Sequence, residues 1–171
     1  NPGTATTGYG VVDGNGTRLI HIAHGVISTP PTLGFAERLR LLFEQAQALI
    51  AEHGPDSVAV EKLFFSQNVS TGIGVAQARG VIALAGALAG LPIGEFSPLE
   101  VKSATVGYGK ATKRQVQEMV KVLLNLADVP RPDDAADALG LAICQVQTGL
   151  TAARFEAVYR AKGSSSRKSG R

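Results

Sequence analysis

Three acidic residues stand where carboxylates could do chemistry. Glu61 ends a short apolar run, 57–61, that the sequence predicts to be a buried strand. Asp134 and Asp137 are three residues apart near the start of a predicted helix, so they share one face of it. If that face meets the end of the strand, three carboxylates converge and raise one another's pKa unless a cation neutralises them. Such an oxygen-only ligand set selects Mg²⁺ or Mn²⁺ over zinc.

The same acids also have a purely structural explanation. Asp133 and Asp134 could cap the helix and interact with its dipole, while Asp137 faces solvent. Glu61 could simply end a strand beside Lys62. Spacing alone therefore leaves open both a metal site and a capped helix.

The surrounding pattern predicts the elements that must position these residues. The predicted strands cover 8–12, 19–27, 57–61 and 93–97. The first predicted helix begins at 35 and is ended by Gly54 and Pro55, and the others cover 69–88, a turn from 98, 112–126 and 133–146. The first two strands flank the turn-rich segment 13–16 and form a hairpin. Strands come first and then alternate with helices, which predicts an α/β fold with a mixed sheet.

Length and composition exclude several classes of protein. The chain has 171 residues, 44% hydrophobic and 18% charged, which fits one domain and excludes general disorder. No apolar run approaches the ~20 residues that span a bilayer, so no membrane partner is expected. The single cysteine, Cys144, lies in an apolar segment, which predicts a buried thiol in a reducing compartment. No signal peptide precedes residue 1, so a cytoplasmic protein is expected. The histidines at 21, 24 and 53 show no metal-ligand spacing, so we interpret them as structural or surface residues.

Charge is distributed unevenly along the chain. The formal net charge of +3 is too small to identify a nucleic-acid-binding protein. Five basic residues face one acid between 102 and 121, and five more with no acid lie between 160 and 171. The end of the chain is rich in Ser, Gly and basic residues, so 154–171 is predicted to be a disordered tail after a domain at 1–153.

Six segments together resemble one known family. In order, they are NPGTATTGYGV from Asn1, VAVEKLFF from Val58, GVAQARGV from Gly74, VK at 101–102, KRQVQEMV from Lys113 and DAADAL from Asp134. Each segment alone is weakly specific, but all six in this order and spacing resemble the bacterial RuvC Holliday-junction resolvases up to about residue 153. The resemblance implies an RNase H-like fold, a homodimer, and Mg²⁺-dependent nicking of two opposed strands of a four-way DNA junction in recombination and repair.

The resemblance assigns four catalytic and metal-binding positions, one of which departs from the family pattern. Glu61, Asp134 and Asp137 match three carboxylates, and the fourth falls on Asn1, where the family has aspartate. Losing this charge in a two-metal reaction should slow cleavage on the order of 10³-fold, so we expect junction binding with impaired cutting. The family also has a strand running into this position, so we expect either that the sequence given omits it, which we favour, or that the sheet lacks its central strand.

The resemblance further implies where DNA and partners bind. Up to two Mg²⁺ ions, or Mn²⁺, would occupy the acidic site. Phosphate contacts are expected from a set of basic side chains, namely Lys102, Lys113 and Arg114, supported by Lys110 and Arg79. Phe64, beside Phe65, is expected to stack at the branch point, although an aromatic pair is also typical of a core. The small-residue helix 69–88 is the expected dimer interface, and branch-migration motor proteins are expected partners.

Other functions remain open at this point. One is an RNase H-like nuclease that acts on another structured nucleic acid. Another is a junction-binding protein without catalysis, which Asn1 favours. An actin-like or sugar-kinase-like phosphate binder would need a second related domain, for which 171 residues leave no room.

Overall fold

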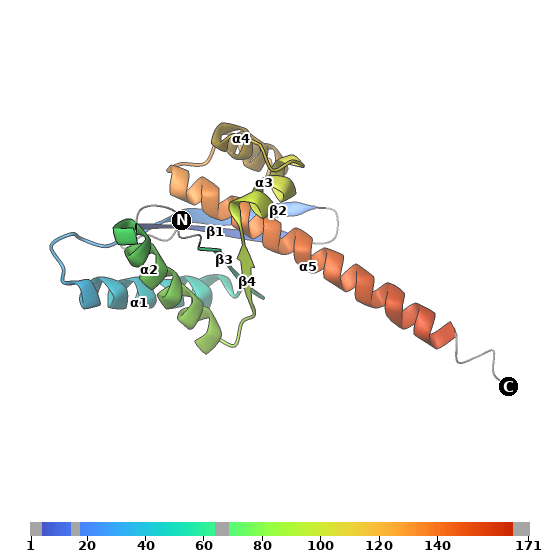
Figure 1. Cartoon of the computed structure of the whole chain (residues 1–171), viewed down its shortest axis with the longest axis horizontal. Helices are drawn as coiled ribbons and strands as arrows, with labels where there is room; N and C mark the ends of the chain where they lie inside the picture. The colour runs from blue at the N-terminus through green and yellow to red at the C-terminus, as the bar shows by residue number, and fades with distance from the viewer. Residues whose placement is uncertain (1–4, 15–17, 64–68, 166–171) are drawn as a thin grey trace.

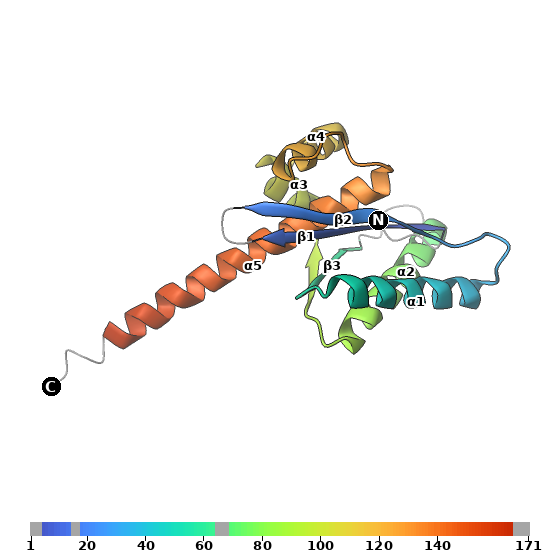
Figure 2. The same cartoon turned by 180° about the vertical axis from the view of Figure 1, so that it is seen from behind.

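The fold places helices on both sides of a β-hairpin. The computed structural model describes residues 5–14, 18–63 and 69–165, with the side chains of 69–71 and 150–165 left outside that description. Its elements are β1 (Thr6–Gly14), β2 (Leu19–Ser28), α1 (Phe35–His53), β3 (Val58–Glu61), α2 (Val69–Leu88), β4 (Ile93–Phe96), α3 (Pro98–Val106), α4 (Lys113–Leu123) and α5 (Asp133–Ser165). Helices α1 and α2 lie on one side of β1 and β2, and α3 and α4 lie on the other (Figure 1 and Figure 2).

The hairpin of β1 and β2 is antiparallel, as the sequence predicted, although residues 15–17 of its turn lie outside the described residues. Its register shifts between Val11 and Val12, which leaves Ile22 as an extra residue in β2. The bulge brings two histidines of β2 onto one face, and His21 Nε2 lies 2.7 Å from His24 Nδ1. Burial, followed by the charge of His24, lowers the pKa of His21.

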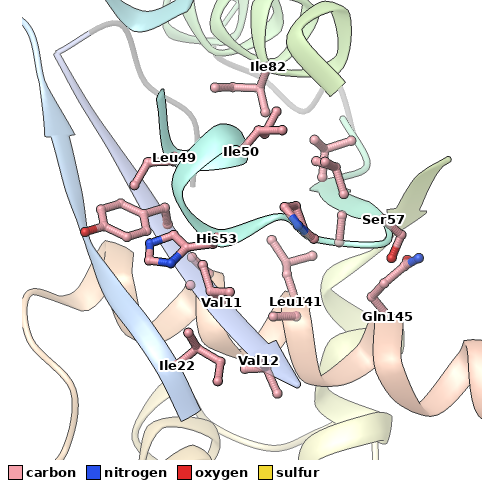
Figure 3. Close-up of a pocket in the computed structure, with 18 of the residues that line it drawn as sticks. Val11, Val12, Ile22, Leu49, Ile50, His53, Ser57, Ile82, Leu141 and Gln145 are labelled. Carbon is pink, nitrogen blue, oxygen red and sulfur yellow. The ribbon is translucent and has the colours of Figure 1, made fainter. Parts of the chain in front are cut away.

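Strands β3 and β4 pair in parallel, with Glu61 opposite Phe96 at the end of the ladder. The predicted mixture of antiparallel and parallel pairing is therefore present, but it is divided between two two-stranded sheets. A cavity of about 660 Å³ separates the sheets, lined by β1, β3, α1 and α5 (Figure 3). Apolar side chains, including Val11, Ile50 and Leu141, project into it.

Local sequence signals fix the ends of several helices. Helix α1 ends at Gly54, whose φ of 52° is a left-handed conformation that glycine adopts readily. Ser97 caps α3 and Thr112 caps α4, each in a reciprocal capping box with the residue three positions on. Within the described ranges, no helix combines the length and apolar character needed to cross a membrane.

Helix α5 is longer than the sequence predicted. It begins at Asp133 as expected but continues to Ser165, so the predicted end at Val146 is wrong. Residues after 149 include many good helix formers, such as Ala, Arg and Lys, which can extend a helix after its apolar stripe has ended. The predicted boundary at 153 falls inside this helix, and a separate disordered tail over 154–171 stays a prediction.

Two buried clusters lie on opposite faces of the hairpin. On one face, α4 and α5 contribute Val120, Leu139 and Ile143, which pack with Val12 of β1. On the other face, residues of α1 and α2 pack with the hairpin. Cys144 of α5 is 3% exposed, which confirms the predicted buried thiol.

Helix α5 approaches β1 closely because two glycines of β1 face it. A Cβ atom added at Gly8 would lie 1.9 Å from the main-chain oxygen of Asp134. One added at Gly10 would lie 2.8 Å from the main-chain nitrogen of Leu139. No side chain fits at these distances, so glycine lets the backbone of α5 lie directly on the strand and brings the start of α5 to the hairpin.

We therefore predict that Gly8→Ala destabilises the fold, because the new methyl group would have to displace the backbone of α5. The free energy of unfolding, measured by urea denaturation, should fall by roughly 1–3 kcal/mol or more. Gly149→Ala is the matched control in α5, since nothing lies within 4 Å of its added Cβ, and it should be neutral or up to about 1 kcal/mol stabilising. Equal effects of the two substitutions would contradict the close approach.

Candidate functional site

Glu61 supplies one carboxylate of the candidate site, at the carboxyl end of β3. The strand is held by β4, and Lys62 N–H donates to the carbonyl oxygen of Phe96 at 2.8 Å just beyond the ladder. The Glu61 side chain is half-buried, and burial raises its pKa above the usual value. The negative charge of Asp137 raises this pKa further. The charge of Asp137 therefore acts on Glu61, although the two residues are far apart in the sequence.

The acidic start of α5 meets the first residue of α4. Lys113 Nζ lies 3.2 Å from Asp137 Oδ2 and 3.3 Å from Asp133 Oδ2. Partial burial would lower the pKa of Lys113, but its hydrogen bonds to Asp137 and Asp133 outweigh that effect and raise it. The hydrogen bond from Lys113 also lowers the pKa of Asp133. A lysine ammonium group thus neutralises part of the acidic cluster.

The three predicted carboxylates are only partly brought together. Asp137 and Glu61 interact electrostatically, whereas Asp134 packs its main-chain oxygen against Gly8 of β1. Among the described residues, no group of three or more His, Cys, Asp or Glu side chains is arranged to hold a metal ion. Carboxylate oxygens remain the ligands that suit a hard divalent cation. The ammonium group of Lys113 forms an ion pair with the carboxylate of Asp137, which such a cation would need as a ligand.

The predicted DNA-contacting residues have different surroundings. Arg79 is only 19% exposed and makes two internal contacts, with the main-chain oxygen of Glu61 and with the carboxylate of Glu95. Three other basic residues on or near α3 and α4 make no ion pair within the described part of the chain, namely Lys102, Lys110 and Arg114. Asn1, Phe64 and Phe65 lie outside the described residues.

Sequence reasoning missed the groups that hold the acids in place. Glu95 gave no signal, because a single acid in a four-residue strand has no recognisable spacing. The only signal for the contact of Lys113 with Asp137 is that the two residues have opposite charges and lie near the starts of two predicted helices. The sequence pattern does not show that these two helix starts lie side by side. In both cases the partner is distant in the chain, so the contact depends on the tertiary fold.

A protein-family model described as "Crossover junction endodeoxyribonuclease RuvC" matches residues 1–145. The chain belongs to the RuvC family. It is similar to RuvC of Heliobacterium modesticaldum, with 53% identity over 84% of this chain and 89% of the relative. It is also similar to RuvC of Chloroflexus aurantiacus, with 52% identity over 91% of this chain and 94% of the relative.

Solved structures of RuvC share the fold. Thermus thermophilus RuvC in complex with a Holliday junction substrate matches with a TM-score of 0.83 and 30% identity, over 88% of this chain and 92% of that chain. A second Thermus thermophilus RuvC structure matches with a TM-score of 0.76 and 33% identity, over 84% of this chain and 88% of that one. The resemblance to RuvC and the α/β, RNase H-like fold expected from it are confirmed.

The raised pKa of Glu61 predicts a pH-dependent cost to stability. A carboxyl group whose pKa is higher in the folded state favours folding when it is protonated. Its contribution is lost as the pH rises from the ordinary value of 4.5 through the raised one. In EDTA, Glu61→Gln should therefore raise the free energy of unfolding at pH 7, and the gain should disappear below pH 4.5.

The matched control for this prediction is Glu118→Gln, which changes an exposed glutamate of α4. The control should leave the pH dependence of unfolding as it is in the parent chain. Urea denaturation at several pH values measures both variants. If Glu61→Gln and the parent lose stability in parallel over the whole pH range, burial of the Glu61 carboxyl has no energetic consequence.

Proposed function

We propose that this chain is a junction-specific, metal-dependent endonuclease that nicks opposed strands of four-way DNA in recombination and repair, acting in the cytoplasm. The observation that carries the proposal is that the negative charge of Asp137 acts on Glu61 at the end of β3, in a chain of the RuvC family. A structural neighbour with the same fold is a RuvC in complex with a Holliday junction substrate. Glu61 ends β3 and Asp137 lies near the start of α5, so the tertiary fold is needed for the charge of one to act on the other.

The residues proposed to hold metal are Glu61, Asp134 and Asp137, with Asn1 as the fourth position. Their oxygen atoms suit Mg²⁺ or Mn²⁺, and up to two ions are proposed. When bound, such ions supply an activated water and neutralise charge that develops on the phosphate. For Asp137 to become a ligand, Lys113 must release its carboxylate, 3.2 Å away. Once released, the ammonium group of Lys113 is free to hold a phosphate oxygen of DNA.

Asn1 is proposed to impair cleavage while leaving junction binding in place. An amide offers one neutral oxygen and lacks the charge of the family's aspartate. The remaining carboxylates would hold at least one metal ion weakly. A junction-binding protein without catalysis is therefore the second candidate function, and Asn1 is the observation that favours it.

The proposed DNA surface follows α3 and α4 beside the acidic site. Its basic residues are Lys102, Lys110, Lys113 and Arg114. Such side chains provide the positive charge that an acidic site needs to approach the DNA backbone. Phe64, beside Phe65, is proposed to stack at the branch point, where bases are unpaired. Arg79 is left out of this surface, because its guanidinium group is already bonded inside the protein.

A homodimer is proposed to form through α2. Three large apolar side chains of α2 are at least half exposed, namely Ile73, Leu84 and Leu88. They lie along one helical stripe that includes Gly80, where an added Cβ would meet nothing within 4 Å. Two copies related by a two-fold axis would present two sites to a two-fold junction. Branch-migration motor proteins are proposed as further partners by the family relationship.

The direct test restores the family's carboxylate with Asn1→Asp. We predict an increase in nicking of a four-way junction on the order of 10³-fold in Mg²⁺, because a metal-binding charge returns to the site. Gel assays at fixed salt should show that both proteins bind the junction and that neither cuts a matched linear duplex. Equal binding of junction and linear duplex would contradict the proposal, and absence of cutting by the aspartate variant would favour the non-catalytic function.

The contribution of Lys113 to DNA binding has its own test. Lys113→Gln should weaken junction binding and reduce the magnitude of the slope of log K against log salt by about 1, because one phosphate contact is lost. Arg40→Gln is the matched control, since Arg40 lies on α1 and pairs with Glu44 at the surface. Fluorescence anisotropy at several salt concentrations measures the slopes. If the slope is the same in both variants, Lys113 is not in the interface.

A further inference from the structure

Arg79 of α2 connects three elements at the edge of the candidate site. Its Nε donates a hydrogen bond to the main-chain oxygen of Glu61 at 2.9 Å. A terminal nitrogen of the same guanidinium group forms an ion pair with Glu95 of β4. With a side chain that is only 19% exposed, Arg79 points into the protein. One planar group thus joins α2 to the end of β3 and to β4.

The carbonyl group of Glu61 needs a partner that β4 does not provide. Val58 and Lys62 donate their N–H groups to Pro92 and Phe96, at 3.0 and 2.8 Å. Main-chain groups alternate between the two edges of a strand, so those of Glu61 point to the edge away from β4. That edge borders the cavity, and no described strand pairs with it. Among the described residues, Arg79 bonds to this carbonyl group, and an unpaired main-chain carbonyl is costly in a partly buried position.

Glu61 is also the last residue of β3, so the ladder does not restrain the chain beyond Lys62. The direction of the Glu61 side chain follows from the orientation of its own peptide group. A bond to the carbonyl oxygen fixes that orientation, whereas a contact with the carboxylate would compete with metal or DNA. Arg79 leaves the carboxylate free and restrains the backbone that carries it.

We propose that Arg79 is a positioning residue that holds the carboxylate of Glu61 toward Asp137, with Glu95 orienting the guanidinium group. The proposal rests on the function proposed above for Glu61. Arginine suits this role because its rigid fork directs N–H groups to two acceptors at once. Lysine keeps the positive charge but has a single flexible ammonium group, so Arg79→Lys separates geometry from charge.

The experiment compares Arg79→Lys with two controls in the Asn1→Asp chain. Arg40→Lys changes an arginine that pairs with Glu44 on the exposed face of α1. Glu95→Gln removes the anchor of Arg79 but leaves the bond to Glu61 possible. Three quantities are measured for each variant: the melting temperature, the ¹³C chemical shift of the Glu61 carbonyl carbon, and the affinity for Mn²⁺ by calorimetry.

We expect Arg79→Lys to shift the Glu61 carbonyl signal and to weaken Mn²⁺ binding by about tenfold or more, as loss of a residue that orients a ligand does. Glu95→Gln should have a smaller effect on both quantities, and Arg40→Lys should change neither. If Arg79→Lys lowers the melting temperature while the carbonyl shift and the Mn²⁺ affinity stay within about twofold of the parent, the role of Arg79 is only structural and the proposal fails.

The two proposals can fail separately in this design. If the parent with Asp at position 1 binds no Mn²⁺, the proposed metal-dependent function is wrong. The carbonyl shift then decides the role of Arg79 alone. A shift that moves in Arg79→Lys and not in Arg40→Lys supports positioning of Glu61, and an unmoved shift overturns it.

Discussion

The contact between the backbones of β1 and α5 determines where the acidic residues lie. Gly8 and Gly10 have no side chains to separate the strand from the helix, and an added Cβ at Gly8 would fall 1.9 Å from the oxygen of Asp134. The same contact places the first turns of α5 beside the hairpin, so that Asp137 acts on Glu61 of β3. A site assembled from a strand end and a helix start thus depends on the absence of two side chains elsewhere.

Two basic side chains of the protein, Lys113 and Arg79, bind to groups of the acidic site or of its edge. Lys113 is shared by Asp133 and Asp137, and Arg79 is shared by Glu95 and the backbone of Glu61. The two cations differ in exposure, since Lys113 is 53% exposed and Arg79 is 19% exposed. An exposed ammonium group can exchange its carboxylate for phosphate at little cost, whereas a partly buried guanidinium group that bonds a main-chain oxygen cannot do so as readily. The first cation is therefore suited to binding and the second to maintaining geometry.

The elements with local signals could be predicted from the sequence, and the contacts between them could not. The hairpin, the end of α1 at Gly54 and the start of α5 at Asp133 depend on turn residues, a left-handed glycine and charge near a helix dipole. The predicted end of α5 at Val146 was wrong because the apolar pattern marks where a helix touches the core and gives no signal of where it stops. The six family segments identified the family, but they carried no information on the partners of Arg79 or Lys113.

Glu61 and Asp137 are proposed to belong to one metal-binding site. A double-mutant cycle on Mn²⁺ affinity can show whether they do, using Glu61→Gln, Asp137→Asn and the double variant in the Asn1→Asp chain. If the two carboxylates share a metal ion, the two substitutions should be strongly non-additive, with a coupling of about 1.4 kcal/mol or more, a tenfold effect on affinity. Additive losses within about 0.3–0.5 kcal/mol would mean that the two carboxylates act independently and do not form one metal-binding site.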